Sequence, residues 1–302
     1  IYKSDKYGQM IFASYLIRLI INTEKVFPHY LFNFTKTKMY WNQVEANSTA
    51  VTQPNLNAEK IKEFQIPLPP KDIQQKIVAE IEVLEKKEIE TRHEIQKLQN
   101  SIVKEIEKHE FQEESLGNIV SFKNGLNYNR QSSGDIISIV GVKDFQNKFV
   151  PDLNLLEEIQ IEGKLSDDYK LNPCDILVVR SNGSANLVGR FLFIEKILTT
   201  TSFSGFTIRL RPHSERVNSK YLFYYLRTEK VRDKLTKNSK GSNIKSLNQS
   251  LLSSLKVTLP SIEKQSEIVR LIEEIEYKIS DLEKQIADIP KQKEQILNKY
   301  LN

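Results

Sequence analysis

An internal repeat of 191 residues constrains this chain more than any other feature of its sequence. Identical short runs recur at that single offset, without a gap, across some 65 residues. The matching runs are Ile17-Arg18-Leu19 with Ile208-Arg209-Leu210, Tyr30-Leu31-Phe32 with Tyr221-Leu222-Phe223, Leu68-Pro69 with Leu259-Pro260, Gln74 with Gln265, Ile77-Val78 with Ile268-Val269, and Ile81-Glu82 with Ile272-Glu273. Chance matches do not hold one offset over that length, so we interpret the chain as a duplication.

The duplication indicates which parts of the two copies are present. Residues 1–111 mirror residues 192–302, so the second copy is complete over roughly 112–302. The first copy has no counterpart of residues 112–191, and the chain begins with Ile1. We therefore expect the parent protein to contain two full units and this chain to lack the front of the first.

Composition excludes several classes of protein. With Cys174 as the single cysteine and four scattered histidines, the chain has neither a disulfide framework nor a cysteine-based zinc site. We expect Cys174, beside a proline, to be a core residue and not a nucleophile. No apolar run reaches about 18–20 residues and no signal-peptide core opens the chain, which favours a cytoplasmic protein. A net charge of +5 suggests an anionic partner.

Each copy is predicted to end in a long helix that follows proline. Apolar residues recur with alternating spacings of four and three, which is typical of a coiled-coil seam. The first seam contains Ile77, Ile81, Leu84, Glu88, Thr91, Ile95, Leu98 and Ile102, and the second contains Ile268, Ile272, Ile275, Ile279, Leu282, Ile286 and Ile289. Because an apolar stripe must be buried, we expect the two helices to pack together. Pro290 should break or kink the second helix and leave 291–301 as a separate turn or short helix.

The remainder of the second copy has the pattern of a mixed α and β domain. Short runs rich in β-branched and aromatic residues predict strands at 136–140, 175–179, 191–194, 206–210 and 255–259. Shared apolar faces predict a helix over 219–237 and a shorter one over 247–254. The predicted fold class is α+β.

Positive charge is concentrated in one half of this domain. Residues 176–258 contain 15 Lys or Arg and 4 Asp or Glu, a balance of +11, whereas residues 119–175 have a balance of −3 and residues 71–110 one of −2. A surface that contacts phosphates has this character. A solvated surface with surplus lysines is the alternative reading.

Three predicted loops combine cations with amides and hydroxyls, the groups that bind phosphates and base edges. Each also has the composition of an ordinary polar turn. The candidate DNA-binding residues in these loops, together with one nearby arginine, are Lys123, Asn124, Asn127, Tyr128, Arg130, Arg180, Ser181, Asn182, Ser184, Arg190, Lys237, Lys240, Ser242, Asn243 and Lys245.

Catalytic patterns are weak by comparison. Asp152, Glu162 and Lys164 match the order of residues in a metal-dependent nuclease. The segment between them is acidic, and we expect no apolar strand there to place Glu162 and Lys164. The chain contains no glycine-rich phosphate loop and no run of the kind that amino-methyltransferases use on a flipped base. The sequence therefore favours a binding protein over a catalyst, without a metal site of its own.

A duplicated unit of this kind, globular and then helical, resembles the specificity subunit of Type I restriction-modification systems. The resemblance covers the whole chain and depends on the order and duplication of several short motifs. These are Gln53-Pro54-Asn55-Leu56-Asn57, Ile66-Pro67-Leu68-Pro69-Pro70 and Gln74 in the first copy, and Leu116–Gly125, Asp175–Ser181, Val188-Gly189-Arg190, Gly241-Ser242-Asn243-Ile244, Val257-Thr258-Leu259-Pro260 and Gln265 in the second.

The resemblance implies an organisation into recognition domains and spacers. Two target recognition domains, each reading half of a bipartite site in double-stranded DNA, would be joined by two spacer helices packed as an antiparallel coiled coil. The corresponding divisions are a truncated first recognition domain at 1–69, a first spacer helix at 70–110, a second recognition domain at 111–260 and a second spacer helix at 261–302. The helices would set the half-site spacing and dock methylation subunits, two of them by expectation, and restriction subunits would join that core.

The resemblance also implies a non-catalytic subunit without cofactors of its own. S-adenosylmethionine, ATP and magnesium would belong to the partner subunits. Two other functions stay open on the sequence. The chain is alternatively the specificity region of a fused restriction-methylation enzyme, or a coiled-coil scaffold that binds only proteins, although the scaffold would leave the charge of 176–258 without a purpose.

Overall fold

The computed structural model describes residues 1, 6, 8–48, 56–108, 112–128, 133–145, 149–181, 187–237 and 247–301, with the side chains of 236 and 237 excepted. Two compact units are present. The first contains residues 1–98 and 278–302, and the second contains residues 99–277. Each unit is described by itself below.

All the regular secondary structure that the structure describes in the first unit is helical. Three short helices precede a long one, namely α2 (Pro28–Phe34), α3 (Lys38–Asn47), α4 (Ala58–Lys62) and α5 (Lys71–Glu107), and the end of α9 (Ile262–Leu301) completes the unit. The side chains of Thr37 and Asn57 accept hydrogen bonds from the first turns of α3 and α4, which is how such residues start helices. The core joins Tyr30 of α2 to Ile77 and Ile81 of α5 and to Leu297 of α9.

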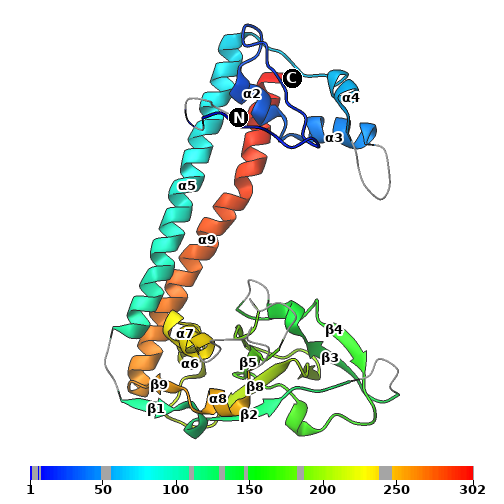
Figure 1. Ribbon diagram of the computed structural model, residues 1–302. Helices are drawn as coiled ribbons and strands as arrows, with labels where there is room; N and C mark the ends of the chain where they lie inside the picture. Colours follow the sequence, from blue (N-terminus) through cyan, green and yellow to red (C-terminus); the bar gives the residue numbers. More distant parts are fainter. Residues whose placement is uncertain are drawn as a thin grey trace. The chain divides into compact units, whose positions relative to one another are not determined.

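Helices α5 and α9 pack side by side in antiparallel directions within this unit (Figure 1). Glu80 accepts hydrogen bonds from Lys299 and Tyr300, while Glu85, one turn further along α5, pairs with Lys293, earlier in α9. In the second unit the end of α5 and the start of α9 again share one core, which contains Ile106, Ile268 and Ile272. The packing predicted from the two apolar stripes is therefore confirmed.

Thr91 and Pro290 are residues that do not fit the apolar pattern of the two predicted helices. Thr91 is buried in the first seam, where its hydroxyl donates to the Lys87 carbonyl of the same helix. The expected break at Pro290 is wrong, because α9 continues through this proline to Leu301. A proline in a helix removes one hydrogen bond, but Ile289 and Leu297, on either side of it, are both buried. Tertiary packing thus outweighs the local preference.

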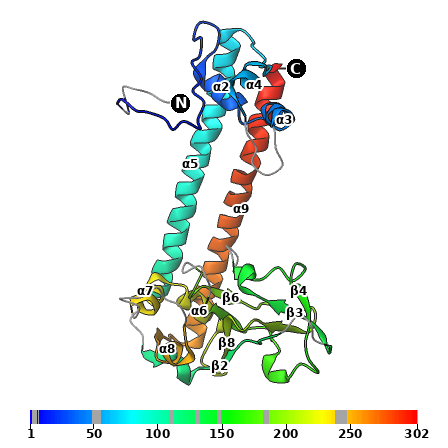
Figure 2. The same ribbon diagram turned by 45° about the vertical axis from the view of Figure 1, so that its right-hand side comes forward.

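The described residues of the second unit form three sheets, which are antiparallel or mixed (Figure 2). The largest has the order β2-β8-β5-β6, a smaller one has the order β4-β3-β7, and β1 pairs with β9. The strands are β1 (Glu113–Ser115), β2 (Val120–Asn124), β3 (Ile136–Val140), β4 (Glu157–Gln160), β5 (Ile176–Val179), β6 (Phe191–Phe193), β7 (Thr201–Phe203), β8 (Thr207–Pro212) and β9 (Lys256–Thr258). All five predicted strands are present, with small shifts at their ends.

Three helices pack with these strands. They are α6 (Ser219–Leu226), α7 (Glu229–Lys237) and α8 (Gln249–Ser253). The single helix expected over 219–237 is wrong, because Arg227 and Thr228 interrupt it. The Thr228 hydroxyl donates to the Tyr225 carbonyl, and its own carbonyl accepts from Arg232, so α7 starts anew at this residue. A side chain that bonds to nearby backbone in this way competes with a continuous helix.

The internal repeat is visible in the structure as well as in the sequence. The Tyr30 hydroxyl donates to the Pro67 carbonyl at 2.7 Å, and the Tyr221 hydroxyl donates to the Thr258 carbonyl at 2.9 Å. Both partners of the second bond lie 191 residues after those of the first. The duplicated segments therefore share a hydrogen-bonding arrangement.

The two copies differ where the first has no counterpart of the sheet. Ile208 and Leu210 are fully buried in β8, between β2 and β5. Their equivalents Ile17 and Leu19 are 40% and 53% exposed, and lie in a segment without regular secondary structure. The same sequence pattern forms a central strand only where neighbouring strands bury it.

Burial in the seam predicts a measurable difference between two isoleucines of α5. Ile81 is 1% exposed and Ile89 is 58% exposed. Ile81→Ala should lower the free energy of unfolding by about 2–5 kcal/mol, because it removes buried methyl groups and leaves a cavity. Ile89→Ala is the matched control and should change it by less than about 0.5 kcal/mol. Denaturant unfolding followed by circular dichroism measures both, and equal losses would contradict the proposed seam.

Candidate nucleic-acid interface

The structure describes seven of the fifteen candidate residues in full. These are Lys123, Asn124, Asn127, Tyr128, Arg180, Ser181 and Arg190. Lys237 ends α7, but its side chain lies outside the described part of the chain. The remaining candidates, Arg130, Asn182, Ser184, Lys240, Ser242, Asn243 and Lys245, also lie outside the described residues.

The first two candidate segments meet at one end of the large sheet. Strand β8 lies between β2 and β5, and its register places Asn124 opposite Ile208 and Val179 opposite Thr207. Residues that follow β2 and β5 therefore emerge on either side of the start of β8. The Gly125 amide donates to the Thr207 carbonyl and the Arg180 amide to the Phe206 carbonyl, which fixes both segments to the same short stretch.

The described residues after the third candidate segment contact both of the others. The Leu247 amide donates to the Arg180 carbonyl at 2.6 Å. The Gln249 amide group donates to the Asn124 side chain at 3.1 Å. Arg190 lies nearby at the start of β6, where its carbonyl accepts from the Val179 amide. The fold thus gathers segments that are far apart in the sequence.

Glycines permit this close approach. A side chain at Gly125 would meet the Ser204 carbonyl oxygen at 2.0 Å, and Gly189 adopts a φ of +80°. Backbone so near to backbone leaves no room for a Cβ, and a positive φ favours glycine. Both glycines therefore permit the close backbone contacts at this end of the sheet.

Arg180 is held by its backbone on both sides, through the amide that bonds to Phe206 and the carbonyl that bonds to Leu247. Its Nε atom is buried and has no hydrogen-bond partner among the described residues. A buried donor without a partner is rare and costly in proteins. The Arg180 backbone is therefore fixed on both sides, whereas its Nε atom makes no described hydrogen bond.

Lys123 and Asn124 lie in a strand and not in the loop expected for them. The Lys123 ammonium bonds to Asp168 at 3.0 Å and lies 4.7 Å from the centre of the Tyr169 ring. This hydrogen bond is the main reason why the pKa of the Asp168 carboxyl is below its usual value. The Lys123 charge is thus already paired within the domain.

Several other cations counted in the basic half are also structural. Arg211 makes a bidentate pair with the buried Asp175, with both distances 2.7 Å. Arg209 is 6% exposed and donates to the carbonyls of Asp168 and Lys170. Arg227 is an exposed residue, but its guanidinium lies 3.6 Å from the centre of the Phe149 ring, and partial desolvation there lowers its pKa to about 10.

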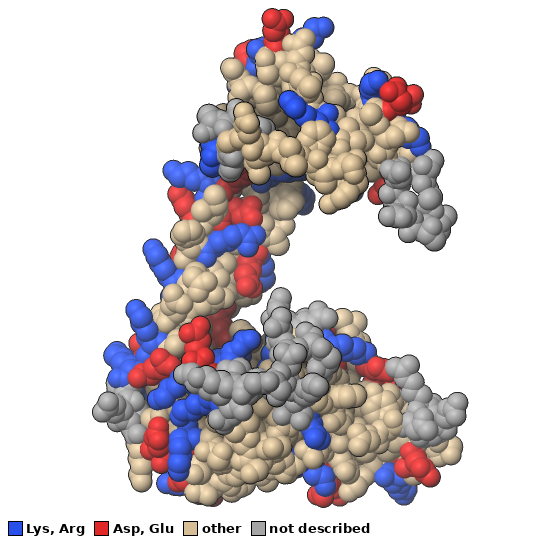
Figure 3. Space-filling model, viewed as in Figure 1, with Lys and Arg blue, Asp and Glu red and all other residues tan. Residues whose placement is uncertain are grey.

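These contacts reduce the number of positive charges available to a partner. The sequence balance of +11 did not separate structural cations from free ones, because burial is not encoded in charge counts. The sequence did contain one sign that Arg209 and Arg211 are structural. They are two residues apart in a predicted strand, so their side chains lie on the same face of the sheet. Figure 3 shows Lys and Arg on the surface, with Asp and Glu beside many of them on the visible face.

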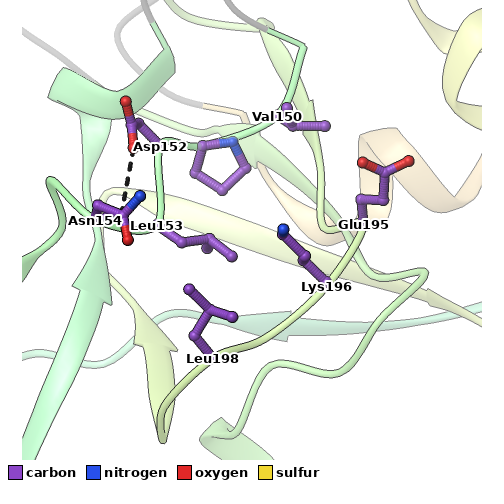
Figure 4. A pocket seen from close by; sticks show the side chains of 8 residues that line it. Val150, Asp152, Leu153, Asn154, Glu195, Lys196 and Leu198 are labelled. Atoms are coloured by element: carbon purple, nitrogen blue, oxygen red, sulfur yellow. Dashed lines mark hydrogen bonds between the residues drawn. The ribbon is translucent and has the colours of Figure 1, made fainter.

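The nuclease pattern is not assembled. A pocket of about 330 Å³ is lined by residues 150–154, Glu195, Lys196 and Leu198 (Figure 4). It contains Asp152 but neither Glu162 nor Lys164. A strand, β4, does lie between these residues, but its sequence is Glu-Glu-Ile-Gln and only Ile159 of it is buried, against β3, so it is not the apolar strand that a nuclease site would need. Among the described residues, no group of three or more His, Cys, Asp or Glu is placed to hold a metal ion.

Cys174 is exposed, which corrects the expected core position. Its backbone φ of +74° places it in a turn before β5, where its amide donates to the Ile194 carbonyl. Turn geometry and not burial therefore explains this residue. Within the described part of the chain, no helix is long and apolar enough to cross a membrane.

Comparison with known proteins places the chain in a family. The model of the Type I restriction modification DNA specificity domain matches residues 1–100 and 108–290. The chain is 28% identical over 274 residues to the specificity subunit of the Type I restriction enzyme StySPI from Salmonella potsdam, covering 82% of this chain and 58% of that relative. The chain thus spans less than two thirds of the length of this curated relative.

Solved structures share the fold. A structure that describes complex assembly and conformational transition of the type I R-M system matches with a TM-score of 0.61 and 19% identity, covering 93% of this chain and 72% of the other. The HsdS subunit from Thermoanaerobacter tengcongensis matches with a TM-score of 0.51 and 19% identity, covering 93% and 71%. The chain therefore belongs to the Type I restriction modification DNA specificity domain family.

Proposed function

We propose that this chain belongs to the DNA sequence-recognition subunit of a Type I restriction-modification complex and contributes no catalysis of its own. The observation that supports the proposal is the junction at one end of the β2-β8-β5-β6 sheet, where Asn124 and Arg180, at the ends of β2 and β5, contact Gln249 and Leu247. Side chains projecting from such an edge have the chemistry to bind phosphates and base edges. The candidate DNA-binding residues of these segments are part of this proposal.

The long helices would serve as the spacer of the same subunit. We assign residues 1–69 to the end of a first recognition domain, 111–260 to a second, and 70–110 and 261–302 to the spacer helices. Helix α5 has 37 residues and α9 has 40. At about 1.5 Å per residue, helices of this length extend about 55–60 Å, which is between one and two turns of duplex DNA. The same helices would dock methylation subunits, which carry S-adenosylmethionine, while restriction subunits would supply ATP- and magnesium-dependent steps in the cytoplasm.

The direct test is sequencing of methylated bases in a genome that expresses the complete system. A bipartite motif with a fixed gap is the expected result, and its loss on deletion of the gene for this subunit would link the motif to this chain. Methylation that persists after the deletion, or a motif without a gap, would contradict the proposal. The motif then defines the duplexes for the binding experiments below.

Charge reversal at the third candidate segment should weaken DNA binding. In the assembled complex, Lys237→Glu, Lys240→Glu and Lys245→Glu together should reduce the slope of log affinity against log salt by up to about 2.7, at about 0.9 per lost phosphate contact. The matched control is Lys86→Glu, Lys87→Glu and Lys97→Glu on α5, which makes the same change in charge on exposed residues of a helix. Fluorescence anisotropy across a salt series measures both. Equal losses in the two variants would indicate a general effect of charge.

Neutralising Asp168 should have the opposite effect. Asp168→Asn releases the Lys123 ammonium from its 3.0 Å pair and removes one negative charge near the candidate surface. We expect the affinity for duplex DNA to rise severalfold at low salt, with the salt slope steeper by about 0.9. Asp281→Asn, on α9, changes net charge by the same amount and is the control. An unchanged slope in Asp168→Asn would place Lys123 outside the DNA-binding surface.

A further inference from the structure

A buried glutamine sits at the fourth position of α9, where the helix meets the rest of the second unit. Gln265 is 0% exposed. Its side-chain oxygen accepts from the Asn218 amide at 2.8 Å, and its amide group donates to the carbonyls of Arg216 and Pro260, both at 2.8 Å. One side chain therefore joins the start of α6, the loop before it and the start of α9.

The first unit has the same arrangement at the fourth position of α5. Gln74 is 1% exposed, and its side-chain oxygen accepts from the Phe27 amide at 2.8 Å. Its amide group donates to the carbonyls of Lys25 at 3.0 Å and Pro69 at 2.8 Å. Every partner lies 191 residues before its counterpart around Gln265.

Asn218 and Phe27 are the residues that precede the first turns of α6 and α2. Backbone amides at such positions lack a partner within the helix. The glutamine supplies one acceptor and two donors, which together satisfy one such amide and two loop carbonyls. No other uncharged side chain of this length can both accept and donate hydrogen bonds through an amide.

Two further contacts accompany each glutamine. The tyrosine hydroxyl of α2 or α6 donates to a carbonyl just before the long helix, through Tyr30 and Pro67 or Tyr221 and Thr258. Further along, Lys36 pairs with Glu85 at 3.4 Å. The equivalent residues Arg227 and Glu276 attract each other as well, since Glu276 opposes the fall in the Arg227 pKa.

We propose that these contacts form a joint, centred on Gln74 in one copy and Gln265 in the other, that fixes the angle between a recognition domain and its spacer helix. The two glutamines are positioning residues for half-site spacing. The effect on DNA binding rests on the proposed function. The joint itself is defined by contacts within the chain and does not depend on that function. Three hydrogen bonds from one buried side chain resist rotation about the helix start, which apolar packing alone tolerates.

The DNA experiment uses the assembled complex and the bipartite duplex found by methylation sequencing. Affinity is measured for the natural gap and for gaps one base pair longer or shorter. Gln265→Glu keeps the shape and the acceptor but turns both donors into acceptors that face carbonyls. We expect the ratio of affinities between the natural and altered gaps to fall about tenfold, while affinity for a duplex carrying only the half-site of the second recognition domain is retained. Gln285→Glu, on an exposed part of the same helix, is the control.

A second measurement needs no DNA. Spin labels at Glu162→Cys and Glu274→Cys, in a Cys174→Ser background, report the distance between the domain and the start of α9 by double electron–electron resonance. Both sites are exposed and lie in the second unit. We expect a narrow distribution in the parent chain and a clearly broader one with Gln265→Glu.

Tyr221→Phe is a second, milder variant in case Gln265→Glu does not fold. It keeps the buried ring and removes one hydrogen bond of the joint. It should broaden the distribution to a smaller degree, whereas Tyr277→Phe, at an exposed position, should not. An unchanged width in both joint variants would overturn the proposal. Broadening in a complex that does not bind bipartite DNA would retain the joint and reject the proposed function instead.

Discussion

Burial of two apolar stripes against each other is the interaction on which the rest of this structure depends. Helices of the length of α5 and α9 are not stable in water unless their apolar faces are covered. Within each unit, residues from both helices enter one core, with Ile81 and Leu297 in the first and Ile106 and Ile272 in the second. In the first unit α2 packs on this pair, and in the second unit the sheets and short helices do. Loss of the stripe would therefore expose the core of either unit.

Several positive charges of the second unit are used within the domain. Arg209, Arg211 and Arg227 pair with backbone carbonyls, a buried carboxylate or aromatic rings, and they stabilise the domain. Cations held in this way are not available to a partner, so the balance of +11 over residues 176–258 exceeds the charge that a partner would meet.

Periodic patterns made most of the architecture predictable from sequence. The repeat, both long helices and five strands follow from spacing and residue type, because burial imposes those periods directly. Strand β4 escaped prediction since its sequence, Glu-Glu-Ile-Gln, has one buried residue and depends on pairing with β3. The end of the helix at Arg227 and the continuity of α9 through Pro290 are set by particular tertiary contacts. The meeting of the loop segments depends on strand order, which no local pattern encodes.

The two copies also form a natural comparison of one pattern in two surroundings. Phe32 is 44% exposed and its equivalent Phe223 is 2% exposed, as with the isoleucine and leucine pairs of the segment before them. Apolar side chains gathered on a surface adhere to one another. In the second unit the neighbouring strands and helices cover the equivalent side chains, so the cost of exposing this pattern to water is present in one copy and absent from the other.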